Sequence, residues 1–248
     1  MNSRMKIQLV IAGSLICAGS VLASPVNVTI YDGQTASGYV GSGIGGEDND
    51  TEPGTIKSDA WDLEALGYTA STRKLDVIGT YNFATGETAH GKTYRAGAIF
   101  IGSGSSLPGA HDWSYAYVLN FNNNTYSLYN SFSIVLPTDI PASSPWTITS
   151  SANPVATGSF DYLTGLANPD GFDLTVMNSG YANQHNMISL SLTDLPAELL
   201  SDFYIHTTME CGNDVLNGYH QSVPDSGMTL GLLGMGITGL ALIRRKLA

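Results

Sequence analysis

The sequence predicts an all-β protein whose central region folds as a single antiparallel β-sandwich or jelly-roll-like domain. Short runs in which apolar and polar residues alternate recur along the chain, as expected for strands with one buried face. Turn-forming clusters such as Asn122-Asn123-Asn124 separate these runs. No crossover helix is expected between them, which favours antiparallel pairing. A composition with 28 glycines, 13 tyrosines and only 12% charged residues also suits turn-rich β-structure.

The strands are predicted in chain order from this alternation. Val26–Ile30 comes first, with Val26, Val28 and Ile30 on one face. Eight further strands are predicted: Lys74–Gly79, Ala98–Ile101, Tyr115–Phe121, Thr125–Tyr129, Phe132–Leu136, Gly158–Tyr162, Met187–Leu192 and Phe203–Met209. Tyr117–Phe121 and Tyr126–Ile134 flank the Asn-rich turn, and we expect them to form a hairpin.

Two short helices are predicted within this region, over Ser58–Leu66 and Leu195–Leu200. The region from residue 24 to residue 222 is long enough to bury a core without disulfides. Cys17 belongs to the N-terminal segment described next, which leaves Cys211 without a cysteine partner. Because cysteine behaves as a small apolar side chain, we expect Cys211 to be buried.

Residues 1–23 have the pattern of a secretory signal peptide that forms an N-terminal helix. Arg4 and Lys6 give a cationic start, and Ile7–Cys17 is an apolar stretch too short to span a bilayer comfortably. Val21 and Ala23 suit the −3 and −1 positions of signal peptidase, so Ser24 is the expected first mature residue. The chain is therefore expected to be secreted.

Residues 223–248 form a second signal in three parts. The turn Val223-Pro224-Asp225-Ser226-Gly227 precedes the uncharged stretch Met228–Ile243, and the cluster Arg244-Arg245-Lys246 follows it. The apolar stretch is predicted to be a transmembrane helix, with the cationic cluster on the cytoplasmic side. The body then lies outside the membrane, anchored transiently or permanently. A plain C-terminal anchor is the alternative interpretation of this segment.

These three parts together resemble the PEP-CTERM group of sorting tails, in its VPDSG variant. The resemblance implies that an exosortase, a multi-pass membrane enzyme, recognises the tail and cleaves or transfers the chain near the motif. It also implies a Gram-negative-type envelope, often with an exopolysaccharide matrix. More loosely, the stretches Trp61–Ala65, Asp76–Gly79 and Thr208–Asp214 resemble ectodomains that carry this tail, which implies no particular activity.

The charge distribution argues against binding to nucleic acid. Five of the ten basic residues lie in the two terminal segments, so five remain in the central region against nearly all of the 21 acidic residues. Such a surface repels phosphate backbones and attracts divalent cations or basic partners.

The glycine-rich stretch Gly43–Gly54 is a candidate calcium site. Glu47, Asp48, Asp50 and Glu52 supply four carboxylates within six residues, and calcium prefers oxygen ligands. The spacing does not match an EF-hand loop. A solvated acidic loop is the alternative interpretation.

A second polar cluster, Glu210–Asp214, follows the last predicted strand. If the first and last strands pair, Glu210 or Asp214 would join Asp48 and Asp50 around calcium. The tentative site then comprises Asp48, Asp50, Glu52, Glu210 and Asp214. Alternatively, Glu210 and Asn213 cap backbone groups where the strand ends.

No catalytic motif stands out, and we predict no enzymatic activity. The chain has no Gly-x-Ser-x-Gly or His-Glu-x-x-His motif, and its five histidines lack the spacing of zinc ligands. A glycoside hydrolase, which needs two suitably placed carboxylates, is the weakest alternative.

Carbohydrate binding is the main alternative function. Three tryptophans and 13 tyrosines provide aromatic faces for sugar rings. Trp113, which follows a loop rich in glycine, serine and proline, is the best candidate for an exposed stacking ring. Tryptophans in sandwiches also serve in core or edge packing.

Taken together, these patterns predict a secreted protein of the envelope or extracellular matrix with a structural or adhesive role. Calcium is the one cofactor suggested. The expected partners are signal peptidase, exosortase and an extracellular polysaccharide, and the C-terminal helix contacts the membrane before processing.

Overall fold

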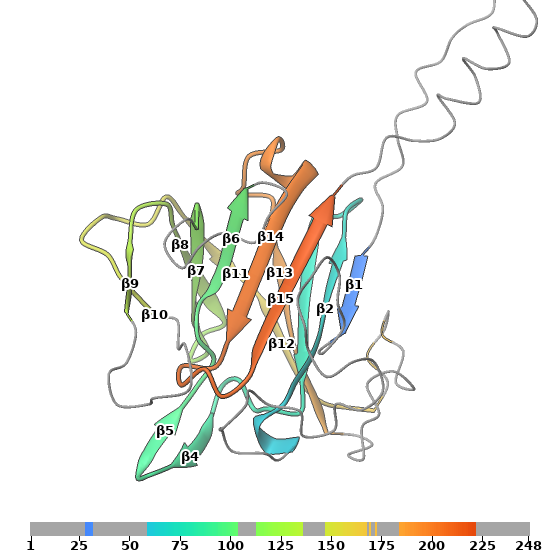
Figure 1. Cartoon of the computed structure of the whole chain (residues 1–248), viewed down its shortest axis with the longest axis vertical. Helices are drawn as coiled ribbons and strands as arrows, with labels where there is room; N and C mark the ends of the chain where they lie inside the picture. The colour runs from blue at the N-terminus through green and yellow to red at the C-terminus, as the bar shows by residue number, and fades with distance from the viewer. Residues whose placement is uncertain are drawn as a thin grey trace, which may run out of the picture. The chain divides into compact units, whose positions relative to one another are not determined.

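The computed structural model describes residues 28–31, 59–103, 113–135, 147–167, 169, 172 and 184–221. Within these ranges the regular structure consists of β-strands and two short 3-10 turns, η1 (Asp59–Trp61) and η2 (Leu199–Ser201). The prediction of an all-β protein is therefore confirmed (Figure 1).

Most strands belong to two antiparallel sheets. The five-stranded sheet has the order β1 (Val28–Tyr31), β2 (Leu63–Thr69), β3 (Lys74–Gly79), β13 (His185–Ser191) and β12 (Asp161–Leu166). The six-stranded sheet has the order β11 (Ala156–Ser159), β8 (Thr125–Tyr129), β7 (Tyr115–Asn120), β6 (Ile99–Ser103), β14 (Asp202–Thr208) and β15 (Val215–Gln221). Two small hairpins accompany them, β4 (Glu87–Ala89) with β5 (Lys92–Tyr94), and β9 (Ser133–Val135) with β10 (Thr147–Thr149).

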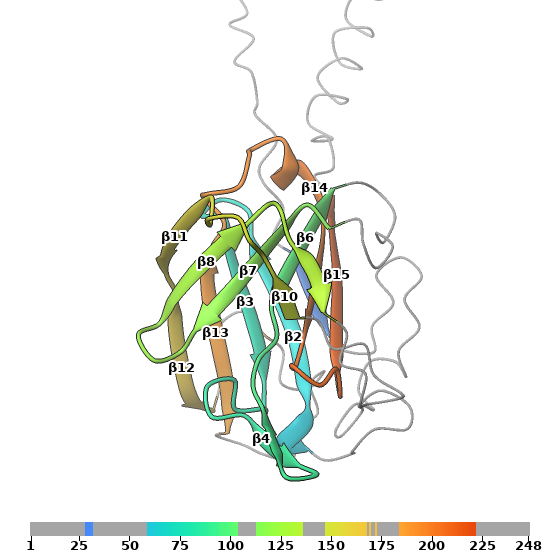
Figure 2. The ribbon, with the colours of Figure 1, turned by 90° about the vertical axis from the view of Figure 1, so that its left-hand side faces the viewer.

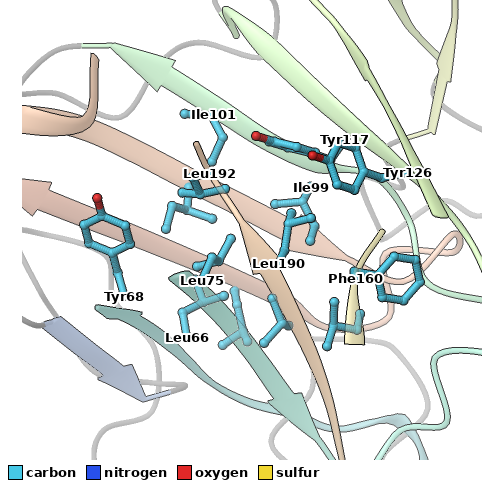
Figure 3. Packing of buried hydrophobic residues seen from close by; sticks show 14 of the residues in the cluster. Leu66, Tyr68, Leu75, Ile99, Ile101, Tyr117, Tyr126, Phe160, Leu190 and Leu192 are labelled. Atoms are coloured by element: carbon cyan, nitrogen blue, oxygen red, sulfur yellow. The ribbon is translucent and has the colours of Figure 1, made fainter. Parts of the chain in front are cut away.

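One hydrophobic cluster draws side chains from both main sheets (Figure 3). Leu75 and Leu190 enter it from the five-stranded sheet, and Ile99 and Tyr117 from the six-stranded sheet. All four are fully buried. Because side chains alternate across a strand, each of these strands turns its other residues away from this shared core.

Smaller clusters lie on the opposite faces of the two sheets. On the six-stranded sheet, Phe100 and Trp113 form a buried aromatic cluster. Three partly buried residues pack against it: Phe132, which precedes β9, Ile134 of β9 and Ile148 of β10. On the five-stranded sheet, the buried cluster consists of Ala65, Ile78 and Met187, and it is joined by Leu166 and Phe172.

Several predicted elements are confirmed and others are wrong. The strands at Lys74–Gly79 and Thr125–Tyr129 have the predicted bounds, and the hairpin across the Asn-rich turn is β7–β8. The predicted strand Gly158–Tyr162 is instead divided at Phe160, a buried residue between β11 of one sheet and β12 of the other.

Both predicted helices are wrong. Ser58–Leu66 was expected to be helical, but its described part forms η1 and then the first half of β2. Leu195–Leu200 contains only the start of the 3-10 turn η2. In both segments apolar residues are buried without a regular period of two, and that spacing imitates a helical pattern.

The signal peptide over residues 1–23 and the sorting signal over residues 223–248, with their predicted helices, lie outside the described residues. In the part of the chain that is described, no helix is long and apolar enough to cross a membrane.

Candidate functional site

The turn between β14 and β15 contains both described members of the tentative calcium site, Glu210 and Asp214. Gly212 makes the turn possible, because its φ of 65° lies in the left-handed region that favours glycine. Its N–H donates to the carbonyl of Met209 across 2.9 Å. The turn therefore holds two carboxylates at the end of the six-stranded sheet.

Asp214 is 2% exposed, and both of its carboxylate oxygens accept backbone hydrogen bonds. Oδ2 accepts the N–H of Leu63 at 2.5 Å, and Oδ1 accepts the N–H of Val215 at 2.8 Å. Leu63 begins β2 and Val215 begins β15, so one side chain joins the starts of two strands in different sheets. The hydroxyl of Thr208 also donates to the carbonyl of Asp214 at 2.7 Å.

Glu210 has a similar structural role on the other side of the turn. Its Oε2 accepts the backbone N–H of Arg95 at 2.8 Å, and its own N–H donates to the Arg95 carbonyl at 2.7 Å. The alternative prediction, that Glu210 and Asn213 cap backbone groups, is therefore confirmed for Glu210. Asp214, for which no capping was predicted, accepts backbone hydrogen bonds as well.

The calcium site itself is only partly within the described residues. Asp48, Asp50 and Glu52 lie outside them. The assumption that the first and last strands pair is wrong, since β1 pairs with β2 while β14 pairs with β6 and β15. Among the residues that the structure describes, no group of three or more His, Cys, Asp or Glu side chains is placed to hold a metal ion. Calcium binding stays a prediction of the sequence.

Trp113 does not offer the exposed ring that the sequence suggested. Its side chain is 7% exposed, and its ring centroid lies 6.0 Å from that of Phe100 and 5.5 Å from that of His206. Trp61 is buried as well, at 5% exposure, while Trp146 lies outside the described ranges. Stacking on sugar by Trp113 is therefore inconsistent with its packing.

His206 is buried in the same aromatic cluster. Burial lowers its pKa to about 4, although the hydrogen bond between its ring and Asn217 acts in the opposite direction. Its Nδ1 lies 2.9 Å from Oδ1 of Asn217 on the neighbouring strand β15. The imidazole is therefore neutral at physiological pH.

The structure also contains a buried Glu64–His185 pair that sequence reasoning missed. Oε2 of Glu64 lies 2.7 Å from Nδ1 of His185, and the two side chains are 2% and 0% exposed. The pair connects β2 to β13, which are separated in the sheet by β3. No local sequence signal indicates it, because 121 positions separate its members. Its complete burial suits a structural link rather than contact with a substrate.

Cys211 is 4% exposed, which confirms its expected burial. Burial raises the pKa of its thiol to about 11, against a smaller opposing effect of backbone hydrogen bonds. The thiol is therefore protonated at neutral pH and poorly nucleophilic.

Comparison with known proteins identifies the C-terminal segment. The family described as the VPDSG-CTERM motif matches residues 222–247. This match confirms the resemblance to a PEP-CTERM-type sorting tail and covers Val223 to Gly227 as well as the basic cluster from Arg244 to Lys246. No curated protein and no solved structure matches the chain.

Proposed function

We propose that this chain, which carries a VPDSG-CTERM sorting tail, is a structural or adhesive protein of the cell envelope or its matrix and has no enzymatic activity. The observation that carries the proposal is the match over residues 222–247. Such a tail marks a secreted, exosortase-processed protein of the envelope. The chain is thus the substrate of the sorting reaction.

The central region supports a structural role. Two antiparallel sheets contribute to one hydrophobic cluster, and we propose that they form the two layers of a sandwich. Glu210 and Asp214 stabilise the backbone through hydrogen bonds. A rigid module of this kind is suited to display outside the cell, where it serves as a surface rather than as a catalyst.

The proposal includes a defined route to the surface. Signal peptidase removes residues 1–23, and Met228–Ile243 then holds the chain in the membrane until exosortase acts at the motif. Calcium bound by Asp48, Asp50 and Glu52 would stabilise the exported domain, since free calcium is abundant outside cells.

Gene deletion in the native host tests the structural role. Cells without the protein are expected to form a less cohesive matrix, measured as the fraction of biomass released by gentle shear. The full chain should restore cohesion, and a chain that lacks residues 223–248 should not, because it leaves the cell without being sorted. Unchanged cohesion in the deletion strain would rule out a structural or adhesive role.

A further inference from the structure

One face of the six-stranded sheet carries small polar side chains in place of charges. We call it the hydroxyl face and define it by Val118, Asn120, Thr125, Ser127, Thr157 and Ser159. These residues come from three neighbouring strands, β7, β8 and β11, which lie side by side in Figure 2.

The strand register orders these residues in rows. Val118, Ser127 and Thr157 lie opposite one another across the three strands, and so do Asn120, Thr125 and Ser159. The residues between them along the strands, such as Tyr117, Tyr126 and Leu128, are buried in the shared core. The hydroxyl face therefore points away from the core.

This face is accessible and extended. Val118 is 38% exposed, and Asn120, Thr157 and Ser159 are exposed as well. Val155, at 50% exposure, precedes β11 and donates its N–H to the carbonyl of Leu128. Neighbouring strands are about 4.8 Å apart, and residues along a strand are about 3.4 Å apart. The face is therefore about 10 Å wide across the three strands and about 14 Å long from Val155 to Ser159.

The absence of charge on this face contrasts with the rest of the chain. The chain has a formal net charge of −11, yet residues 113–160 contain a single charged residue, Asp139, which lies outside the described ranges. The adjacent hairpin β9–β10 also bears serine and threonine, at Ser133, Thr147 and Thr149.

Hydrogen bonds fix the polar groups at one end of the face. Oδ1 of Asn120 accepts the backbone N–H of Asn122 at 3.0 Å, and the hydroxyl of Thr125 donates to Oδ1 of Asn123 at 2.7 Å. The bond to Asn120 uses the oxygen of its amide, and the two N–H donors of the same group suit a sugar hydroxyl. Groups held in place in this way lose little entropy on binding.

We propose that the hydroxyl face binds a neutral polysaccharide. Sugar rings present hydroxyl groups beside C–H patches, and this face presents hydroxyl and amide groups beside Val118 and Val155. An acidic polymer would be repelled by the negatively charged chain. A protein partner is disfavoured, because serine is depleted from protein interfaces and aromatic residues are enriched there. The inference rests on the proposed function, since it names the partner of an adhesive surface protein.

Affinity electrophoresis of the full chain in mild detergent tests this inference. Native gels would contain one of three neutral polymers (dextran, hydroxyethyl cellulose or galactomannan) or the acidic polymer alginate. The wild-type chain should be retarded by at least one neutral polymer and not by alginate. Thr157→Glu should raise the apparent dissociation constant at least fivefold, because it places a carboxylate on the hydroxyl face between the exposed residues Val155 and Ser159. Asn120→Ala should raise it as well.

Thr88→Glu is the matched control, since Thr88 is an exposed threonine on strand β4 of a separate hairpin. It should leave retardation within twofold of wild type, and thermal melting should show that every variant is folded. Failure of all three neutral polymers to retard the wild-type chain would overturn the inference. So would equal retardation of Thr157→Glu and Thr88→Glu.

Two further measurements separate this inference from the proposed function. If sedimentation shows that Thr157→Glu dissociates an oligomer while no neutral polymer binds, the face is a protein interface and the inference is overturned. Fractionation of host cells that express the full chain reports export independently. A chain that is exported but ignores every neutral polymer overturns the inference alone, whereas a chain that binds polymer but remains inside the cell overturns the proposed function.

Discussion

Asp214 shows how one side chain can stabilise a junction between two sheets. Its carboxylate accepts the N–H groups that begin β2 and β15, and it is almost completely buried. Removing it leaves two buried N–H donors without their acceptor, and each such loss costs about 1–3 kcal/mol.

We therefore expect Asp214→Ala to lower the free energy of unfolding by about 2–4 kcal/mol. Asp161→Ala is the control, because Asp161 is an exposed aspartate on β12. It should change stability by no more than about 0.5 kcal/mol. Urea denaturation of both variants measures the difference. Equal stabilities would show that the bonds of Asp214 are unimportant for folding.

His206 makes stability depend on pH. Its pKa is about 4 in the folded protein and 6.5 as the ordinary value, so between these limits the unfolded chain binds a proton that the folded chain does not. Stability therefore falls as pH falls from about 6.5 to about 4, by roughly 1.4 kcal/mol per pH unit and about 3 kcal/mol in total. Burial also lowers the pKa of His220, which acts in the same direction.

Urea denaturation between pH 7 and pH 4.5 checks this effect of His206. The His206→Gln variant should lose less stability over the range than the wild-type chain, since glutamine does not titrate. The carboxylates titrate in both proteins, so their contribution to the pH dependence of stability cancels when the two proteins are compared. Identical pH dependence in the two proteins would contradict the assignment.

The same residues show how far sequence reasoning reaches at a site. Glu210 and Asp214 could be selected because turn chemistry is local. Capping was predicted for Glu210, whereas Asp214 was selected only as a calcium ligand and its backbone hydrogen bonds were not foreseen. Leu63, the partner of Asp214, is 151 positions away, and His185 is 121 positions from Glu64. Such pairs depend on the topology, which no local pattern contains.

Among the elements, the burial of the two faces of a strand explains why β8 was predicted correctly and β2 was not. β8 alternates between half-buried and buried residues, and its bounds were predicted correctly. β2 is buried on both faces over Leu63–Leu66, so the alternation that marks a strand is missing and the segment resembled a helix. Val215–Gln221 was missed although it forms a seven-residue strand, because Gly218 and polar residues interrupt its apolar pattern.

Gly79 permits the close approach of β2 to β3. A Cβ atom at this position would lie 2.5 Å from the carbonyl oxygen of Asp62 and 3.1 Å from Cα of Leu63, and both are backbone atoms that cannot rotate away. We expect Gly79→Ala to destabilise the protein by about 1–3 kcal/mol, the usual cost of overpacking.

Gly67→Ala serves as the control on the adjacent strand β2. The three atoms nearest to its Cβ would all belong to the ring of Phe172, the closest at 3.0 Å, and a side chain can move. Thermal melting should therefore show a larger decrease in Tm for Gly79→Ala than for Gly67→Ala. The reverse order would mean that the junction of β2 and β3 is not as tightly packed as the structure indicates.

For the molecule as a whole, the acidic charge makes calcium the natural ligand to test. The sequence predicts that Asp48, Asp50 and Glu52 bind calcium, and binding to the folded state alone raises Tm. The full chain in detergent should therefore melt at a higher temperature in millimolar calcium than in EDTA. The double variant Asp48→Ala/Asp50→Ala should lose this increase. No increase in the wild-type chain would eliminate the metal site.

The central claim is that the chain is an exosortase substrate that is exported and sorted through residues 222–247. The most direct test is to express it in two otherwise identical hosts, one with exosortase and one without, and to determine its location and its C-terminus by mass spectrometry. With exosortase, the chain should be outside the cytoplasmic membrane and should lack the segment after the Val223–Gly227 motif. Without it, the chain should retain the tail and remain in the membrane fraction. The same location and the same C-terminus in both hosts would contradict the claim.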